Sequence, residues 1–465
     1  MNERRRTRLS NCWTAGAALP RRPRPPLHYH LAFTETFPEF CKQNTKSFRL
    51  AKRERENSHE GRTMTIDKLN AAQVADLHMT MAGHIERGDI PGIVTLIGRG
   101  DEMHVDAIGM KTVGGTEPMR RDTIFRIASI TKPITAAATM ILEDEGKLRL
   151  DDSVERWLPE LANRRVLSRI DSQLDDTVPA RRPITVRDLL TSCFGFGSVM
   201  AMPGTYPIQQ PIRDGHLGGD GPPHPSLTPG TDEWIRRLGE LPLMFQPGER
   251  WAYNTSSDVL GVLIARVSGK SFEAFLRERL FDPLGMQDTA FSVPPSKLDR
   301  LPDVYRFNHD SKNFEVFDSA RNSEYSRPPA FESGAGGLVS TVDDYYAFCR
   351  TMLNKGVWNR KRLLAQASVE SMTSDQLTPQ QRKGTEIFFG SHSSWGFGMA
   401  VNIQPDKPWM VPGRFGWDGG FGTSAYSDPK NDFIGILLTQ RLMDSPEPPA
   451  VFKDFWTHAY RSLQA

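Results

Sequence analysis

The stretch FRIASITK, residues 125–132, decides the predicted fold and chemistry of this chain. It runs into ITKPITAAATMILEDEGKL, residues 130–148, which is rich in Ala, Leu, Met and Glu and repeats apolar residues at helical spacing. Pro133 fits the first turn of such a helix, and Gly146 fits its C-terminal cap. Because residues three apart share one face of a helix, Ser129 and Lys132 are predicted to lie side by side.

This serine and lysine pair has a chemical and a structural interpretation. A serine hydroxyl is a poor nucleophile at neutral pH unless a base takes its proton, and a lysine with a lowered pKa supplies that base. At a helix start the serine also lies at the positive end of the helix dipole, which stabilises negative charge on an attacked carbonyl. The structural alternative is a capping serine followed by a solvated lysine, since Ser-x-x-Lys occurs by chance roughly once in a chain this long.

Two later stretches carry further candidate residues. In ERWAYNTSSDVLG, residues 249–261, Tyr253 follows a turn. A phenol beside a lysine ammonium loses its proton more readily, and it then exchanges protons with a nucleophile. In FGWDGGFGTS, residues 415–424, the glycines allow a strand to approach a ligand closely. Taken singly, each stretch also has a structural explanation: Tyr253 as a tyrosine of the core, and the glycines of residues 415–424 as a plain β-bulge.

The three stretches occur in one order, with LRLDDSVERWLPEL (residues 148–161) after the first. Together they resemble the serine β-lactamase and penicillin-binding-protein superfamily, especially its class C-like esterase branch, the family VIII carboxylesterases, over about residues 68–463. The resemblance implies an α+β, β-lactamase-like fold, in which helices flank an antiparallel sheet and a mostly helical lobe is inserted. The α/β lobe would comprise about residues 64–149 and 330–465, and the helical lobe about residues 150–329.

The resemblance also implies the roles of individual residues. Ser129 would be the nucleophile, and Lys132 and Tyr253 would move its protons. The backbone N–H groups of Ser129 and Gly420 would form the oxyanion hole, where the loss of one donor typically costs about 10²- to 10³-fold in rate. The implied substrate-binding residues are Thr255, Trp417, Asp418 and Gly419.

Two departures from the family's pattern move the predicted substrate from a lactam towards an ester. The family's Tyr-x-Asn block would place Asn at position 255, where this chain has Thr255, with Asn254 one position early. The strand that reads Lys-Thr-Gly or His-x-Gly in the lactamases begins here with Trp417. The cation that recognises the carboxylate of β-lactams is therefore replaced, and an apolar acyl or alcohol group is better served than an anionic one.

The sequence thus predicts a serine hydrolase that transfers an acyl group to Ser129, most simply a carboxylesterase acting on small esters. Two alternatives stay open: a β-lactamase or D-amino-acid peptidase, and a catalytically idle penicillin-recognising-like binding protein. The expected partner is a small-molecule ester or amide, and the oligomeric state is not predicted. Neither a cofactor nor a metal is expected, because the histidines are scattered and form no ligand set.

The proline- and glycine-dense residues 201–230 are too long for an ordinary connector. Such loops commonly border a binding site, so we predict that this segment forms part of the entrance to the site. A plain surface insertion is the alternative.

Composition limits the remaining possibilities. Residues 1–63 hold 14 Lys and Arg against 6 Asp and Glu, whereas the whole chain holds 58 against 56, so the body is mildly acidic. This balance argues against a nucleic-acid groove, and no apolar run is long enough for a membrane span.

Residues 1–63 are predicted to be a disordered basic extension, or to precede a natural start at Met64, rather than to direct export. The four cysteines, which lack disulfide or metal spacing, favour reduced thiols and a cytoplasmic location; they are Cys12, Cys41, Cys193 and Cys349.

Overall fold

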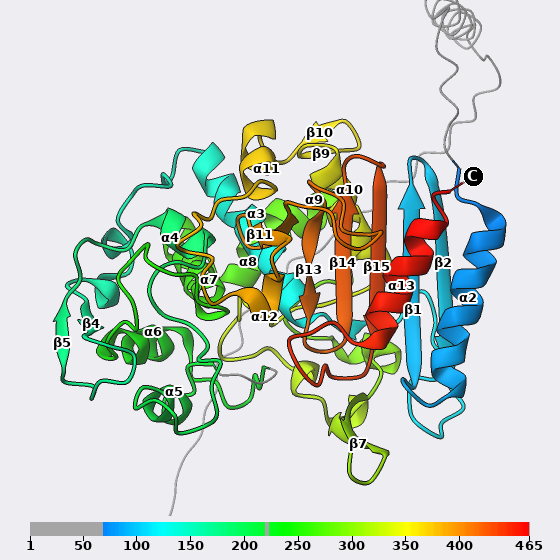
Figure 1. The fold of residues 1–465 in the computed structure, drawn as a ribbon, viewed down its shortest axis with the longest axis horizontal. Helices are drawn as coiled ribbons and strands as arrows, with labels where there is room; N and C mark the ends of the chain where they lie inside the picture. The colour runs from blue at the N-terminus through cyan, green and yellow to red at the C-terminus, as the bar shows by residue number, and fades with distance from the viewer. Residues whose placement is uncertain (1–67, 219–222, 465) are drawn as a thin grey trace, which may run out of the picture. The chain divides into compact units, whose positions relative to one another are not determined.

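A seven-stranded antiparallel sheet forms the centre of the molecule, with the strand order β11-β12-β13-β14-β15-β1-β2 (Figure 1). The computed structural model describes residues 68–218 and 223–464, all within one compact unit, residues 66–465. The predicted α+β class with helices around an antiparallel sheet is confirmed. The expected disorder of residues 1–63 and the first two cysteines lie outside the described residues.

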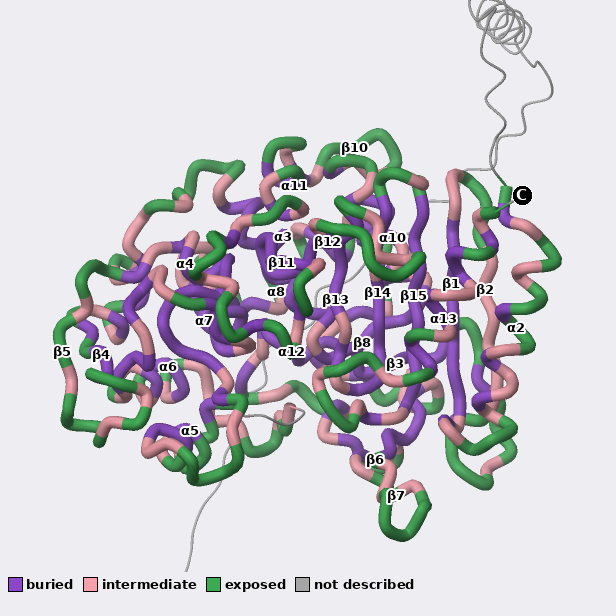
Figure 2. Tube along the Cα trace, in the orientation of Figure 1, coloured by how far each residue is buried: buried purple, intermediate pink, exposed green. Residues whose placement is uncertain are grey.

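The first hairpin and the last strand of this unit pair with each other near one edge of the sheet. The hairpin of β1 (Gly92–Arg99) and β2 (Glu102–Gly109) pairs through β1 with β15 (Phe433–Thr439), from Ile93 opposite Thr439 to Arg99 opposite Phe433. Both β1 and β15 are almost completely buried, so both faces of the sheet must be covered at this point. Figure 2 shows the resulting buried band along these strands.

Alternate side chains of β1 enter two different cores, as the two-residue period of a strand requires. Ile93 and Ile97 pack with apolar residues of α2 (Ala71–Glu86) and α13 (Ala450–Arg461). Val94 and Leu96 pack in the larger core, which includes α3 (Thr131–Asp144) and α10 (Val342–Leu353). Helices therefore cover both faces of the sheet.

The other strands complete the sheet or form separate two-stranded pairs. The remaining sheet strands are β11 (Ser393–Trp395), β12 (Ala400–Asn402), β13 (Phe415–Gly419) and β14 (Thr423–Asp428). The two-stranded pairs are β3 (Phe125–Arg126) with β8 (Val339–Ser340), β4 (Arg165–Leu167) with β5 (Thr177–Pro179), β6 (Val304–Asn308) with β7 (Asn313–Asp318), and β9 (Val357–Trp358) with β10 (Lys361–Arg362).

Further helices lie beside one end of the sheet, and most of them belong to residues 150–329 (Figure 1). They are α4 (Val186–Leu190), α5 (Gln209–Asp214), α6 (Thr231–Glu240), α7 (Thr255–Ser268), α8 (Phe272–Leu276) and α9 (Asp282–Leu284); α11 (Gln366–Met372) and α12 (Glu386–Phe389) follow later in the chain. The division into two lobes stays a prediction. None of the helices in the described residues is long and apolar enough to cross a membrane.

The predicted nucleophile helix is α3, and it lies at the centre of this arrangement. All residues from Thr131 to Leu142 are buried, and α3 packs against α7 and α11. Pro133 lies in its first turn, and Gly146 follows the cap residue with a positive φ of 66°, as predicted. Ser129 lies just before the helix, in a 3-10 turn over Ala128–Ile130.

The segment SWGFGMAV, residues 394–401, forms a tight turn between two short strands. The chain turns back within it, so that β11 and β12 form a hairpin. Gly398 lies in the turn with φ +73° and packs against α3: a Cβ atom there would lie 2.6 Å from the Ala136 Cβ and 2.8 Å from the Lys132 carbonyl oxygen. Only glycine combines this backbone conformation with so close an approach.

Replacing Gly398 with alanine tests this packing. We expect Gly398→Ala to lower the free energy of unfolding by about 2–4 kcal/mol, because the new methyl group meets α3 in addition to the strain of a positive φ. Gly413→Ala is the matched control: its φ is +87° and nothing lies within 4 Å of the added atom. The control should lose only about 1–2 kcal/mol in equilibrium denaturation; equal losses would contradict the packing argument.

Candidate active site

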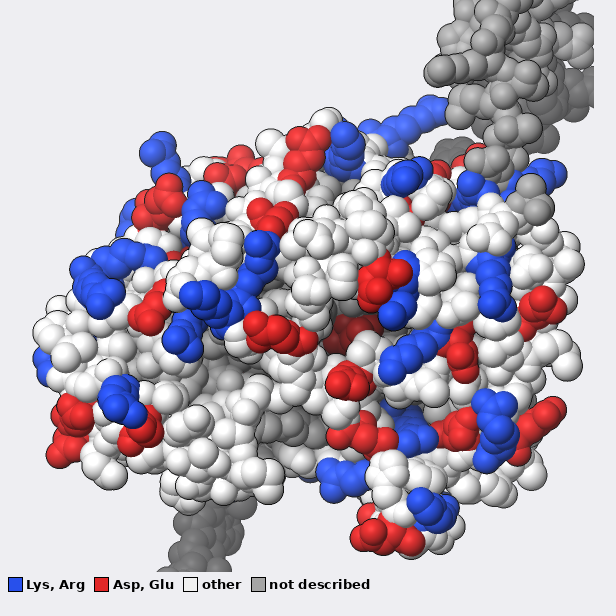
Figure 3. Space-filling view, viewed as in Figure 1, with Lys and Arg blue, Asp and Glu red and all other residues white. Residues whose placement is uncertain are grey.

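A cavity of about 590 Å³ opens at Ser129. Its wall combines residues of α7, β13 and α12 with residues from three further segments: 197–228 without the undescribed 219–222, 329–337, and the segment that follows β15. In Figure 3 the surface is hollowed in the region where Figure 1 places the ends of β13 and α12. The prediction that residues 201–230 border the site is confirmed for its described part, which also contains the unpredicted helix α5.

Ser129 and Lys132 are in contact. The Lys132 amine lies 3.0 Å from the Ser129 hydroxyl, 2.9 Å from the Asn254 side-chain oxygen and 2.6 Å from the Ala335 carbonyl oxygen. Lys132 is only 1% exposed, whereas Ser129 is partly exposed to the cavity. The serine therefore faces substrate while its lysine neighbour is shielded from water.

The three acceptors around Lys132 determine what the amine does in each protonation state. An ammonium has three N–H donors, and it satisfies all three oxygens. A neutral amine has two, and since the Asn254 and Ala335 oxygens only accept, its lone pair faces the Ser129 hydroxyl. Burial lowers the pKa of Lys132 to about 7, so the basic form is well populated at neutral pH.

Asp258 is the carboxylate that acts on this amine. It is 5% exposed and accepts hydrogen bonds from the Ser333 hydroxyl at 2.6 Å and the Ala335 N–H at 3.0 Å. Burial raises the pKa of Asp258, and the Lys132 charge partly offsets that increase. In return the Asp258 charge raises the pKa of Lys132, against the larger effect of burial. The same carboxylate also holds the turn whose carbonyl contacts Lys132.

Tyr253 lies on the other side of the nucleophile. Its hydroxyl accepts a hydrogen bond from the Trp417 indole N–H at 2.9 Å and hydrogen-bonds with Ser129. The Lys132 amine lies over the face of the Tyr253 ring, 4.5 Å from the centroid, and not at its hydroxyl. The expected acidification of the phenol by lysine is wrong, because burial raises the pKa of Tyr253 to about 12. Tyr253 is therefore a neutral proton donor at neutral pH.

The indole of Trp417 fixes the direction of the Tyr253 proton. An indole N–H only donates, so the phenol accepts from Trp417 and directs its own proton elsewhere, towards Ser129. Trp417 is 6% exposed and is held in a cluster of rings formed by Trp251, Tyr253, Phe388, Phe389, Trp395 and Trp417. It lines the cavity and hydrogen-bonds to the phenol, and its role as a substrate contact remains a prediction.

The inner strand β13 approaches the nucleophile closely. A Cβ atom on Gly419 would lie 2.5 Å from the Ile127 carbonyl oxygen and 3.3 Å from the Ser129 backbone nitrogen. Gly420 and Ser129 both line the cavity, and the oxyanion hole formed by their N–H groups remains a prediction. Asp418 also lines the cavity, but its carboxylate accepts from the Ser424 hydroxyl at 2.5 Å, and burial raises its pKa to about 6.

The sequence analysis missed two side chains of this site, Asn254 and Asp258. Asn254 appeared only as a residue one position early, yet its oxygen contacts Lys132 because its backbone adopts φ +81°. With ψ −71° and a hydrogen bond from the Thr255 N–H to the Tyr253 carbonyl oxygen, Asn254 is the centre of a strained γ-turn, for which the local sequence gives no signal. Thr255, which was predicted in its place, begins α7, is 4% exposed and lines the cavity.

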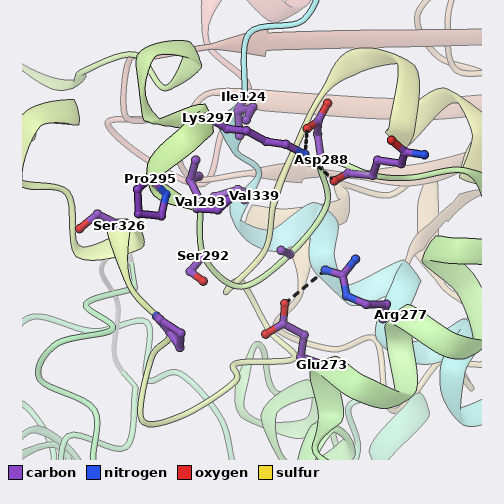
Figure 4. A pocket seen from close by; sticks show the side chains of 14 residues that line it. Ile124, Glu273, Arg277, Asp288, Ser292, Val293, Pro295, Lys297, Ser326 and Val339 are labelled. Atoms are coloured by element: carbon purple, nitrogen blue, oxygen red, sulfur yellow. Dashed lines mark hydrogen bonds and ion pairs between the residues drawn. The ribbon is translucent and has the colours of Figure 1, made fainter. Parts of the chain in front are cut away.

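A second cavity, of about 470 Å³, has no comparable chemistry (Figure 4). Its charged side chains pair with one another: Arg277 lies 3.6 Å from Glu273, and Lys297 lies 2.7 Å from Asp288. Figure 4 shows the two pairs on different sides of the cavity, with Val293 and Val339 between them. Within residues 68–218 and 223–464 no group of three or more His, Cys, Asp or Glu side chains is placed to hold a metal ion.

Comparison with known proteins identifies the family of this chain. The sequence profile of the beta-lactamase family matches residues 70–452. The chain belongs to the beta-lactamase family. The resemblance that was carried by the three sequence stretches is therefore confirmed.

Relatives within the beta-lactamase family have several recorded activities. Protein Rv1367c of Mycobacterium tuberculosis is 35% identical over 367 residues, covering 77% of this chain and 88% of that protein. Esterase EstB of Burkholderia gladioli is 29% identical, with coverage of 77% and 88%. Among solved structures, unliganded simvastatin synthase LovD of Aspergillus terreus superposes with a TM-score of 0.69 at 23% identity, covering 85% of this chain and 100% of that one. At that identity the similarity shows a shared fold.

The hydrogen bond between Trp417 and Tyr253 gives a testable prediction. Trp417→Phe keeps an aromatic ring but removes the donor, so the phenol loses its fixed orientation. We expect the rate at which a fluorophosphonate labels Ser129 to fall about tenfold, as for the loss of one hydrogen bond at a buried group. The rate is measured by mass spectrometry of the labelled chain.

Trp395→Phe is the matched control. The Trp395 ring centroid lies 4.8 Å from that of Trp417, but its indole N–H has no hydrogen-bond partner among the described residues. Its loss removes ring area from the same cluster without removing a contact to Tyr253. Equal slowing in both variants would mean that packing, and not the hydrogen bond, explains the effect.

Proposed function

We propose that this chain is a serine hydrolase that transfers an acyl group from a small ester to its own Ser129 and then to water, as a carboxylesterase does. One observation carries the proposal: a buried lysine amine, with a pKa near neutrality, lies 3.0 Å from a serine hydroxyl that faces a cavity. A structural lysine would not need a hydroxyl neighbour that is open to substrate. The esterases among the relatives support this choice.

The proposed acylation step divides proton transfer between two groups. The neutral Lys132 amine takes the Ser129 proton as the serine oxygen bonds to the ester carbonyl carbon. The carbonyl oxygen becomes negative and accepts hydrogen bonds from the Ser129 and Gly420 backbone N–H groups. As the bond to the alcohol breaks, Tyr253 gives its proton to the leaving alkoxide, and the proton taken up by Lys132 reaches Tyr253 through a water relay, because the amine lies over the ring and not at its hydroxyl. One proton has then moved from the serine to the alcohol.

Deacylation reverses these roles with water in place of the alcohol. Tyr253 and Lys132 together accept a proton from the water as its oxygen attacks the acyl carbon. The collapse of the intermediate releases the carboxylic acid and returns the proton to Ser129. An alcohol in the same position would yield a new ester. Acyl transfer is therefore the second candidate, and relatives named as acyltransferases, such as calJ of Penicillium decumbens, favour it.

An ester fits the site better than a lactam. The amide of Asn254, which would be the natural contact for the amide side chain of a lactam, is bound to Lys132 through its oxygen. Trp417 occupies the strand position where the lactamases have a carboxylate-binding cation, and its N–H is bound to Tyr253. Both polar groups serve the catalytic side chains, which leaves apolar surface for the acyl group.

Substitution of the proposed nucleophile and base tests the function. We expect Ser129→Ala to abolish turnover of para-nitrophenyl acetate and labelling by a fluorophosphonate, and Lys132→Ala to lower kcat/KM by about three orders of magnitude or more. The wild-type chain should hydrolyse this ester faster than a chromogenic cephalosporin. Wild-type activity in Ser129→Ala would remove the proposal, faster lactam hydrolysis would favour a β-lactamase, and an absence of labelling would favour an idle binding protein.

The assignment of Lys132 as base predicts a particular pH dependence. The active form is the neutral amine, which forms as pH rises above the pKa of Lys132, so kcat/KM for a neutral ester should rise with pH through about 7. Because the Asp258 charge raises the pKa of Lys132, Asp258→Asn should move this acidic limb to lower pH. The exposed Asp171→Asn is the control, and its profile should match the wild type. A limb that stays in place or moves to higher pH in Asp258→Asn would exclude Lys132 as the group that titrates.

A further inference from the structure

We infer that the catalytic cavity has a subsite for a carboxylate, formed by Arg213 and His216, so that its substrates are esters that carry a carboxylate away from the reacting bond. This inference rests on the proposed esterase function and names a substrate class for it. Both side chains line the same cavity as Ser129 and lie at the end of α5, in the entrance segment.

The charges of the cavity wall leave Arg213 uncompensated. Its guanidinium contacts the Gln210 side-chain oxygen at 3.2 Å, and it forms no ion pair with any carboxylate in the described part of the chain. The His216 ring likewise makes no hydrogen bond to any residue that the structure describes. An arginine fork in this state matches the two oxygens of a carboxylate, and a histidine N–H adds a further donor.

The carboxylates of the wall are already engaged by other groups. Asp258 accepts from Ser333 and Ala335, and Asp418 accepts from Ser424. Asp444, on the loop after β15, is paired with Arg441 at 2.8 Å. The protein therefore supplies no anion to Arg213 from the described wall, although it has placed three carboxylates around the same cavity.

The segment that carries the two side chains is held in position. Ile212 and Leu217 are buried on either side of them, and the Gly215 carbonyl oxygen accepts a hydrogen bond from Arg237 at 3.2 Å. His216 has a positive φ of 51°, a conformation that costs a non-glycine residue free energy and is found most often at functional sites. The backbone that carries Arg213 and His216 is therefore anchored, and both side chains are exposed at the cavity wall, where a ligand can reach them.

The subsite lies close to the catalytic groups but does not coincide with them. A Cβ atom on Gly218, two residues after His216, would lie 3.7 Å from the Asn254 amide nitrogen, and the Asn254 oxygen contacts Lys132. A carboxylate at Arg213 would therefore belong to a part of the substrate several bonds from the ester carbonyl. The absence of a cation at Trp417 is compatible with this, because the anion is bound by a different element.

Matched pairs of esters test the inference. The first pair is the para-nitrophenyl monoester of adipic acid and para-nitrophenyl hexanoate, which differ in a carboxylate on the acyl side. The second is para-acetoxybenzoate and para-acetoxybenzamide, which differ on the alcohol side. We expect wild-type kcat/KM to favour the anionic member of at least one pair, and this preference to shrink as salt is added.

Variants identify the residues responsible. Arg213→Gln should lower the ratio of anionic to neutral kcat/KM about tenfold, as for the loss of one charge-assisted contact. His216→Asn should lower it less, and asparagine tolerates the positive φ. Arg169→Gln removes one positive charge from an exposed residue outside the cavity, and it should leave the ratio unchanged. A wild-type ratio of one in both pairs, or an equal ratio in Arg213→Gln, would overturn the inference.

A binding measurement separates this inference from the proposed function. Calorimetry with the Ser129→Ala chain compares para-acetamidobenzoate with para-acetamidobenzamide, and no turnover is required. Tighter binding of the carboxylate, lost in the double variant with Arg213→Gln, supports the subsite even if no ester is hydrolysed. Equal binding of the two compounds in the presence of normal ester turnover would overturn the subsite alone.

Discussion

The contact between the Lys132 amine and three oxygens is the interaction on which the site depends. These oxygens belong to the turn before α3, the residue before α7 and the turn before β8, so the amine joins three segments that are far apart in the sequence. A buried amine needs such partners because an unsatisfied polar group in the interior costs free energy. The same burial lowers its pKa, so that one packing arrangement supplies both the structure and the base.

The site separates an acid from a base by their surroundings. Lys132 and Tyr253 are both buried, yet burial moves their pKa values in opposite directions, to about 7 and about 12, because it disfavours the charged form of each group. A neutral amine and a neutral phenol therefore coexist at neutral pH on two sides of Ser129. Two titratable groups with separated pKa values are the usual sign of assigned acid and base roles.

Local sequence patterns predicted the elements whose structure depends on residues that are close in the sequence. The helix α3 and the contact of Ser129 with Lys132 follow from periodicity and spacing. The turn at Gly398 did not follow from the local sequence, because it depends on the close approach of this turn to α3. Asn254 and the Ala335 carbonyl were equally hidden, since their roles arise from backbone conformation and tertiary contact. Arg213 gave no signal, because its meaning depends on which charges line the same cavity.

The most direct test of this account is the ionisation of Lys132 itself. Carbon-13 labelling of the lysine side chains, followed by an NMR titration of the signals next to the amines, reports each lysine without any substrate. The account predicts one lysine that titrates near pH 7, and its signal should disappear in Lys132→Met. If every lysine titrated above about pH 9, in the range of exposed amines, the buried base that organises this site would not exist.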